Sequence, residues 1–581
     1  MILSSPRRTA VPIRVTMLHR LLLTPLFCLL TLSACGQPGN KDGSGNLQRG
    51  LKPARARDQW ADSVYNALSP DERIGQLFMV AAYSGGKNAN EGTVMSMVRK
   101  GQIGGVIFMQ GGPVRQALMN NRLQDAARVP LLVAMDAEWG LGMRLDSVQN
   151  LPRQMMIGAT RDTGLAYAVG RCIAYQCKRL GVHVNFGPDV DVNNNPDNPV
   201  INTRSFGESK QWVSVLGLAY MHGLQDNGVM ACAKHFPGHG DVSVDSHKDL
   251  PVIGKSRAAL DTLELYPFRE LIKGGVQSVM VAHLSVPALE PSRNVPTTLS
   301  PNTITGLLRR ELGFQGLIFT DALNMQGVAK YYPAGEADYR AYLAGNDVLL
   351  FSQDVAGAIG KIKAGLQRGE VNDADLELRV KKILAAKYDA GLNRKSRVNT
   401  TGLTKDLNQY TAALNQQIAN AAVTLVRDDA ALLSRLQKPN PRVAYIAVNG
   451  ALSTSATALL RKAYPSVAFA TVTKSSPDAG VLNRFKDYDV IIIGLHGLSL
   501  NPGNNYGLAP ELRNFLTKAS AQSNVAVALM GNAYATKMFC NVHTILVGYE
   551  DNAATQQAMV LALSGQNKIN GRLPVTPPCL K

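Results

Sequence analysis

Residues 229–247 read VMACAKHFPGHGDVSVDSH, and this stretch decides how the rest of the chain is interpreted. Its first five residues are apolar and predict a buried strand. Pro237, Gly238 and Gly240 exclude regular structure and predict a loop directly after that strand. The segment from Lys234 onward holds three His, two Asp and a Lys. Ionisable groups at this density beside a strand end predict a site of chemistry.

Short apolar runs alternate with amphipathic segments on both sides of this stretch. The apolar runs are residues 78–82, 104–109, 131–136, 182–191, 229–235, 278–286, 316–321 and 347–351. The amphipathic segments include residues 163–180, 210–226 and 256–273. Eight strands, each followed by a helix, predict a (β/α)8 TIM-type barrel, here over residues 58–392. Continuous apolar runs fit strands that are buried on both faces.

Polar residues recur where these predicted strands end. They are Asp136, the pair Asp189 and Asp191, the pair Lys234 and His235, His283, and Asp321. A single Asp at such a position is more often a helix cap or a turn residue. Capping is a weaker explanation when five predicted strands all end in ionisable residues. In barrels of this kind the active site lies at the C-terminal ends of the strands, so we expect these side chains to meet there.

The pattern changes after about residue 390. Residues 393–410 are polar and lack apolar spacing, and we place a linker at 393–420. Apolar runs then return at 443–448, 490–495, 525–530 and 544–548, separated by helical stretches. This alternation predicts a second α/β domain with a parallel or mixed sheet at 421–581. Its role is either structural support or a contribution to the rim of the site.

The N-terminus is typical of an export signal. Met17 and Arg20 precede a short apolar run that ends at Leu32-Ser33-Ala34-Cys35, which resembles a bacterial lipobox. In that interpretation residues 1–35 are a signal peptide, Cys35 is lipidated, and residues 36–57 are a flexible tether. The start is then either Met1 or Met17. The expected location is a bacterial membrane, facing the periplasm or in the outer membrane.

Charge gives little reason to expect a nucleic-acid partner. The net charge is +18, but residues 1–57 hold nine Lys or Arg against one acid. The remaining excess over more than 500 residues is mild, and no basic helix with interleaved aromatics occurs. Among the Cys residues, Cys540 and Cys579 could pair in an exported protein, and the sequence leaves this open.

Three chemistries are open for the loop. His235, His239, Asp241, Asp245 and His247 offer metal ligands, but Pro237 and Gly238 disrupt the helical His-x-x-x-His geometry. Asp245-Ser246-His247 contains the residue types of a hydrolytic triad, yet adjacent residues rarely reach one another as a triad requires. The third is acid–base chemistry by a His that a carboxylate orients, with Asp321 on another strand as nucleophile. This is the logic of retaining glycoside hydrolysis, with His as an unusual acid/base.

The stretch Lys234-His235-Phe236-Pro237-Gly238-His239-Gly240, followed by Asp245-Ser246-His247, resembles the signature of glycoside hydrolase family 3 β-N-acetylglucosaminidases. The resemblance extends from about residue 60 to the end. It implies that His247 is the general acid/base, that Asp245 is its partner, and that Asp321, in Thr320-Asp321-Ala322-Leu323-Asn324-Met325, is the nucleophile. It implies sugar contacts for Asp136, Arg144, Arg204, Lys234 and His235. It also implies an α/β sandwich for the second domain. We expect no metal and no cofactor.

Two positions depart from the family pattern. Trp139 follows Asp136-Ala137-Glu138 where compact relatives tend to have Gly, and Ala322 stands where a second acid is common. Trp139 is therefore expected to change the shape of the sugar subsite. The expected function is retaining exo-hydrolysis of terminal β-N-acetylglucosamine from peptidoglycan fragments or chitin-type oligosaccharides. The alternatives are a glycoside phosphorylase that releases sugar 1-phosphate, and a glycan-binding lipoprotein without turnover. The oligomeric state stays open.

Overall fold

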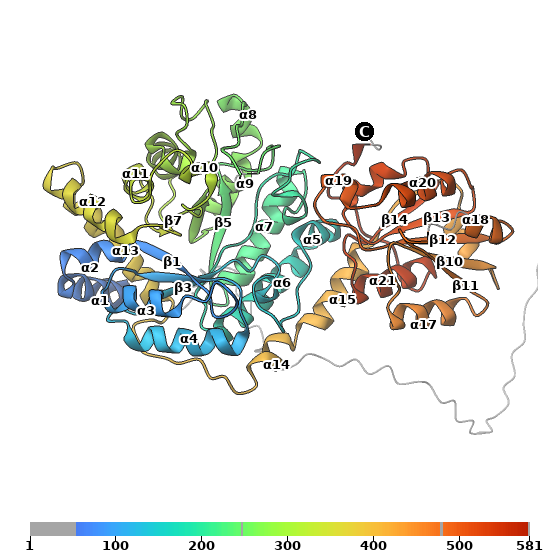
Figure 1. Cartoon of the computed structure of the whole chain (residues 1–581), viewed down its shortest axis with the longest axis horizontal. Helices are drawn as coiled ribbons and strands as arrows, with labels where there is room; N and C mark the ends of the chain where they lie inside the picture. Colours follow the sequence, from blue (N-terminus) through green and yellow to red (C-terminus); the bar gives the residue numbers. More distant parts are fainter. Residues whose placement is uncertain (1–53, 246–247, 477–479, 579–581) are drawn as a thin grey trace, which may run out of the picture. The chain divides into compact units, whose positions relative to one another are not determined.

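The computed structural model of the chain describes residues 54–245, 248–476 and 480–578 (Figure 1). An eight-stranded parallel sheet, drawn in blue to yellow, forms its first part. Its strands are β1 (Phe78–Ala82), β2 (Gly105–Phe108), β3 (Leu132–Met135), β4 (Val184–Asn185), β5 (Met230–Phe236), β6 (Ser278–Val281), β7 (Leu317–Thr320) and β8 (Leu349–Leu350). They pair in the order β7-β6-β5-β4-β3-β2-β1-β8.

The sheet closes on itself between β7 and β8. A parallel bridge joins Phe319 to Val348, and the Val348 N–H donates to the carbonyl oxygen of Ile318 at 3.0 Å. Closure confirms the predicted barrel. The closed sheet places the C-terminal ends of all eight strands at one end of the barrel, where their side chains can meet.

Helices surround the barrel because each crossover between parallel strands must return along the outside. α6 shows how local sequence sets their limits. Its cap Asp162 accepts hydrogen bonds from the N–H groups of Gly164 and Leu165, and Gly181 ends it with a φ of 75°, which favours glycine. The helices are α1 (Ala54–Ala67), α2 (Pro70–Gly75), α3 (Glu91–Arg99), α4 (Pro113–Ala126), α5 (Gln154–Thr160), α6 (Thr163–Leu180), α7 (Lys210–Gln225), α8 (Arg257–Thr262), α9 (Leu265–Lys273), α10 (Gln326–Ala329), α11 (Glu336–Ala344), α12 (Val355–Gln367) and α13 (Asp373–Asp389), with the short turns η1 (Leu141–Met143), η2 (Asn202–Arg204) and η3 (Thr297–Leu299) and the wide helix η4 (Asn302–Glu311).

Several local predictions were wrong. Residues 256–273 form two helices, α8 and α9, because the chain turns at Leu263 and Pro267 can be accommodated only in the first turn of a new helix. In the run 182–191 only Val184 and Asn185 form strand β4, and the chain pairs with β5 again through an isolated parallel bridge between Asp189 and Lys234. The last residues of the predicted tether, 54–57, already belong to α1.

A second sheet of six strands follows, drawn in orange to red in Figure 1. Its strand order is β11-β10-β12-β13-β14-β9, and all neighbours are parallel except β14 and β9. Figure 1 shows α20 on one side of this sheet and α17 and α21 on the other, which is the expected α/β sandwich. The strands are β9 (Thr424–Asp428), β10 (Val443–Val448), β11 (Ala468–Val472), β12 (Val490–Leu495), β13 (Val525–Leu529) and β14 (Thr544–Val547).

The helices of this part include one inside the segment predicted as a linker. α14 forms there because Leu403 and Leu407, one turn apart, both become buried. The edge strand β11 was missed; most of its side chains are only partly buried. The helices are α14 (Leu403–Asn408), α15 (Thr411–Ala422), α16 (Leu432–Leu436), α17 (Thr454–Ala463), α18 (Gly480–Arg484), α19 (Gly503–Tyr506), α20 (Pro510–Ala519), η5 (Ala533–Met538) and α21 (Ala553–Leu563).

The predicted lipidation site Cys35 lies outside the described residues, as does Cys579. Cys540 takes part in a disulfide, whereas Cys172, Cys177 and Cys232 are free thiols. Over the described ranges, no helix combines the length and the apolar character that crossing a membrane requires.

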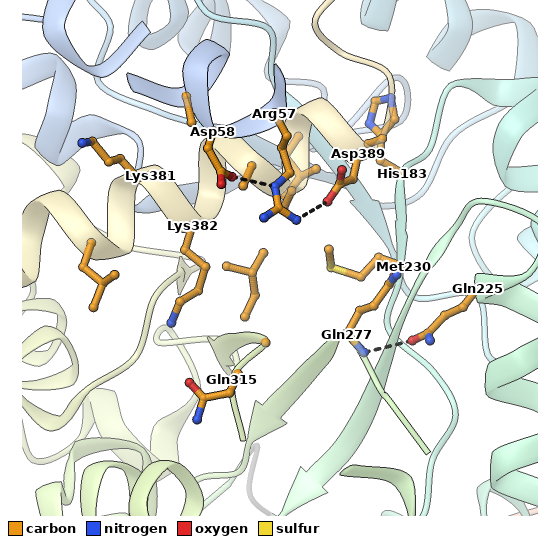
Figure 2. Close-up of a pocket in the computed structure, with 18 of the residues that line it drawn as sticks. Arg57, Asp58, His183, Gln225, Met230, Gln277, Gln315, Lys381, Lys382 and Asp389 are labelled. Carbon is orange, nitrogen blue, oxygen red and sulfur yellow. Dashed lines mark hydrogen bonds and ion pairs between the residues drawn. The ribbon is translucent and has the colours of Figure 1, made fainter. Parts of the chain in front are cut away.

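A pocket of about 760 Å³ opens at the N-terminal end of the barrel (Figure 2). Its lining includes Leu132, Met230 and Leu317, which are the first residues of β3, β5 and β7. Arg57 at its edge is paired with Asp58 at 2.9 Å and lies 3.7 Å from Asp389. None of the site residues predicted from the sequence lines this pocket; those that line a cavity lie at the other end of the barrel.

Candidate active site

The C-terminal strand ends enclose a smaller cavity of about 280 Å³. β3 delivers Asp136, β5 delivers Lys234 and His235, and Asp321 follows β7 directly. The six predicted residues that line it are Asp136, Arg144, Arg204, Lys234, His235 and Asp321. They span 186 positions of the sequence from Asp136 to Asp321, so it is the closed barrel that brings them together.

Asp136 is the acceptor for two cations. Its carboxylate accepts from Arg144 Nη2 at 2.6 Å and from Lys234 Nζ at 3.0 Å. Burial alone would raise the pKa of Asp136, but the charges of Lys234 and Arg144 outweigh it and lower the pKa to about 2. The side chain is therefore ionised at neutral pH and can accept hydrogen bonds from ligand hydroxyl groups.

Glu138 joins Lys234 to Arg204. Its carboxylate accepts from Arg204 Nε at 2.9 Å and Nη2 at 2.7 Å, and lies 2.8 Å from Lys234 Nζ. Burial opposes ionisation, yet the charges of Arg204 and Lys234 hold the pKa of Glu138 well below its ordinary range. Glu138 was not among the site residues predicted from the sequence. The signal was present in its position, two residues after Asp136.

His235 is held by Asp191, a carboxylate from the segment after β4. Its Nδ1 lies 2.7 Å from Asp191 Oδ2, and its Nε2 lies 3.1 Å from Arg204 Nη2. Burial lowers the pKa of His235 to about 4, and the charge of Arg204 acts in the same direction. A neutral ring at neutral pH fits this arrangement, with its Nδ1–H donated to Asp191.

Asp191 also anchors the start of the loop. Its Oδ1 accepts from the backbone N–H of His239 at 2.6 Å, and the His235 N–H also reaches the carboxylate. Burial raises the pKa of Asp191 to about 6, although these N–H groups act against the rise. Asp189 beside it has its pKa raised well above its ordinary value, chiefly by burial and then by the charge of Asp191. Both acids stand at a strand end in the sequence, but no motif marked them as site residues.

Close backbone packing explains a glycine of the loop. An added Cβ at Gly240 would lie 1.8 Å from the carbonyl oxygen of Val192. Asn198, from the same segment after β4, donates to the carbonyl oxygens of His239 and Gly240 at 2.9 Å each. The segment after β4 therefore fixes the first turn of the loop.

Asp321 is the acid expected to be the nucleophile. Burial would raise its pKa, but the fields of His283 and His235 outweigh that effect, and the pKa is lowered. Its Oδ1 accepts from the Ala322 N–H at 2.7 Å. An ionised carboxylate at the wall of a cavity has the properties that a nucleophile needs.

Of the two residues predicted to handle the proton, only Asp245 lies among the described residues. His247 lies outside the described residues. Asp245 is described and half-buried, but it is not part of the cavity lining formed by the described residues. Farther along the loop, Asp249 contacts Lys330 at 3.0 Å and Tyr331 at 3.0 Å, so the loop is attached to the segment after β7.

Asp189, Asp191 and His235 form a group with metal-ligand donors. Their donor atoms lie within 4.8 Å of one another, and within the described ranges this group alone meets that criterion. Asp191 already accepts three N–H groups, one of them from the His235 ring, whereas Asp189 Oδ2 has no hydrogen-bond partner among the described residues. Arg204 also lies 3.7 Å from Asp189. A cation here would displace these hydrogen bonds beside a guanidinium, so the arrangement suits a hydrogen-bonded support better than a metal centre.

A barrel with ionised carboxylates at its C-terminal strand ends is a frequent frame for enzymes that act on small polar substrates. Residues 69–386 match the model of the glycosyl hydrolase family 3 N terminal domain. This match covers more than half of the chain, and the chain belongs to glycosyl hydrolase family 3.

Individual relatives match over different shares of their length. Beta-hexosaminidase A of Pseudoalteromonas piscicida is 34% identical over 368 residues, which are 58% of this chain and 61% of that protein. The chain thus spans less than two thirds of that relative. A beta-N-acetylglucosaminidase/beta-glucosidase of Cellulomonas fimi is 30% identical over 394 residues, 66% of this chain and 69% of the other. The structure of a family 3 beta-N-acetylglucosaminidase from Paenibacillus sp. str. FPU-7 superposes with a TM-score of 0.72 at 29% identity, covering 88% of this chain and 99% of that one.

Proposed function

We propose that the protein is a retaining exo-β-N-acetylglucosaminidase. The observation that carries the proposal is the cavity itself: an ionised Asp321 on one wall, and a set of charged hydrogen-bonding groups built on Asp136, Lys234 and Arg204 on another. The relatives from Pseudoalteromonas, Cellulomonas and Paenibacillus are named as a beta-hexosaminidase or as beta-N-acetylglucosaminidases, which supports the choice of sugar.

The size of the cavity supports exo action. Pockets that hold drug-sized ligands commonly have volumes of about 300–1,000 Å³, and a cavity of about 280 Å³ lies just below that range. Such a space suits one terminal sugar better than a chain. Charged groups such as Asp136 and Lys234 hold sugar hydroxyls through charge-assisted hydrogen bonds.

Each step of the proposed mechanism has a named residue. Asp321 attacks the anomeric carbon and forms an ester bond to it, while the glycosidic C–O bond breaks and His247 gives its proton to the leaving oxygen. Asp245 orients His247 and stabilises its charged form. Water then attacks the anomeric carbon, His247 takes a proton from it, and Asp321 leaves as a carboxylate. Two inversions give net retention.

The test is hydrolysis of an aryl β-N-acetylglucosaminide, with the anomer of the product identified by NMR. Asp321→Ala should abolish turnover and His247→Ala should lower it severely, whereas Asp373→Asn, an exposed acid at the start of α13, should match the wild type. Normal turnover in either of the first two variants would overturn the assignment. Sugar 1-phosphate formed on addition of phosphate would indicate a phosphorylase, and binding without turnover would indicate a glycan-binding protein.

The location and natural substrate are further parts of the proposal. We infer an exported enzyme that is lipid-anchored through Cys35, because Leu32-Ser33-Ala34-Cys35 resembles a lipobox. Radiolabelled palmitate should enter the wild-type protein and not the Cys35→Ser variant; label in the variant would refute the anchor. The substrates are then glycans met outside the inner membrane. A comparison of muropeptides with chitobiose decides between peptidoglycan fragments and chitin-type oligosaccharides.

A further inference from the structure

Trp139 forms part of the cavity wall, and a cation covers its ring. It follows Glu138 at the end of β3, and its carbonyl oxygen accepts from the Leu151 N–H at 2.9 Å. The guanidinium carbon of Arg153 lies 3.8 Å from the centroid of the indole ring. This distance is within the range of an attractive cation–π contact, which restrains both side chains.

Arg153 is in turn fixed from the second sheet. It caps α5, and its backbone N–H donates to Glu550 Oε1 at 2.6 Å. Glu550 comes after β14, and its other oxygen accepts from Asn552 Nδ2 at 3.1 Å. The carboxylate is half-buried, and burial raises its pKa although the N–H and the charge of Arg153 oppose the rise. Glu550 is therefore a fixed hydrogen-bond acceptor for the backbone N–H of Arg153.

We propose that Trp139 is a specificity-determining residue of the sugar cavity, and that Glu550 of the second sheet is a positioning residue that acts on Trp139 through Arg153. The inference rests on the proposed function, since it assigns the ring a sugar to contact. The apolar C–H face of a pyranose packs against an aromatic ring. Such a ring contributes most to sugar affinity when a contact on its other face already restrains it, because less conformational entropy is then lost on binding. The second sheet thus takes part in substrate binding as well as supporting the barrel.

The test uses the full chain and six proteins: wild type, Trp139→Ala, Trp139→Phe, Glu550→Ala, Glu550→Gln and the double variant Trp139→Ala/Glu550→Ala. Each is assayed for kcat and KM on an aryl β-N-acetylglucosaminide and for the Kd of N-acetylglucosamine by calorimetry. Glu550→Ala should raise KM and Kd about 3- to 10-fold with kcat within about twofold, the range expected for one weakened cation–π contact. Glu550→Gln keeps an acceptor for the Arg153 N–H and should restore the wild-type values.

Coupling between the residues distinguishes this role from general support. In the Trp139→Ala background, Glu550→Ala should change KM no further, whereas Trp139→Phe should retain most of the affinity. The control is Glu208→Ala. Glu208 also joins the barrel to the C-terminal part, accepting from the Thr576 N–H at 2.8 Å, but it does not line the cavity among the described residues. Its KM should equal that of the wild type.

Each outcome has a separate meaning. An unchanged KM and Kd in Glu550→Ala, or equal effects of that change with and without Trp139, would overturn the inference while leaving the proposed function intact. A wild type that binds N-acetylglucosamine without hydrolysis would end the proposed function, and Kd would then decide the inference. A wild type that shows neither binding nor turnover would overturn both.

Discussion

Removal of Glu138 should both destabilise the barrel and weaken substrate binding. The side chain is 1% exposed, and Arg204 and Lys234 make three contacts with it between 2.7 and 2.9 Å. Deleting one member of a buried ion pair leaves the other charge uncompensated and typically costs about 3–5 kcal/mol. Lys234 would keep Asp136 as a partner at 3.0 Å, so we expect about 3 kcal/mol, at the lower end of that range.

Two measurements check this magnitude. Thermal unfolding of Glu138→Ala should have a midpoint about 6 °C below that of the wild type, since about 1 kcal/mol corresponds to roughly 2 °C in a large domain. KM for the aryl glycoside should rise, because Arg204 loses the two hydrogen bonds that orient it. Glu138→Gln keeps the shape and one acceptor and should lie between the two proteins.

The chain offers a matched control on its surface. Glu91 accepts from Arg122 Nε at 2.5 Å and Nη2 at 2.8 Å, a similar two-bond geometry, but both side chains are more than a third exposed. Water compensates charges there, so Glu91→Ala should cost less than about 1 kcal/mol and leave KM unchanged. If Glu138→Ala behaved like Glu91→Ala in both assays, the reasoning from buried charge would be refuted.

Three further predictions concern the same end of the barrel. The pKa of Asp136 is lowered to about 2 from an ordinary value of 3.8, so its contribution to stability is full above about pH 4 and is lost as the pH falls toward 2. The wild type should therefore lose its advantage of about 2 kcal/mol over Asp136→Asn in urea unfolding between pH 5 and 2; a constant difference would contradict the shift. Asp191→Ala should lower kcat/KM at least about 10-fold, because a buried charge-assisted hydrogen bond contributes about 1.5–3 kcal/mol. The variant should also exchange the His239 amide proton faster, since that N–H loses its acceptor. Slow exchange at His239 would contradict the idea that Asp191 anchors the loop after β5. Incubation with a chelator should leave turnover unchanged, since the oxygens of Asp191 already accept N–H groups; inactivation would indicate a metal.

Local pattern was sufficient for most elements of the fold. The structure confirms the predicted limits of three strands and one helix, at residues 78–82, 443–448, 490–495 and 163–180. The spacing of apolar residues and the capping residues set these limits, and both depend only on residues that are close in the sequence. The break between α8 and α9 was missed, since an amphipathic pattern continues across it. β4 was predicted too long because the residues after Asn185 remain buried and meet β5 again at Asp189, although they do not form a continuous strand.

By itself the sequence determined the barrel, the strand ends that carry Asp136, Lys234 and Asp321, and the glycine-rich loop after β5. These depend on residue types and on spacing along the chain. Only the tertiary structure decided that Glu138 joins Lys234 to Arg204, that Asp191 holds His235, and that Glu550 reaches Arg153 from 397 positions away. Hydrogen bonds and ion pairs depend on distances of a few ångströms between atoms, and those distances are set by barrel closure and by packing of the second sheet, which no local pattern records.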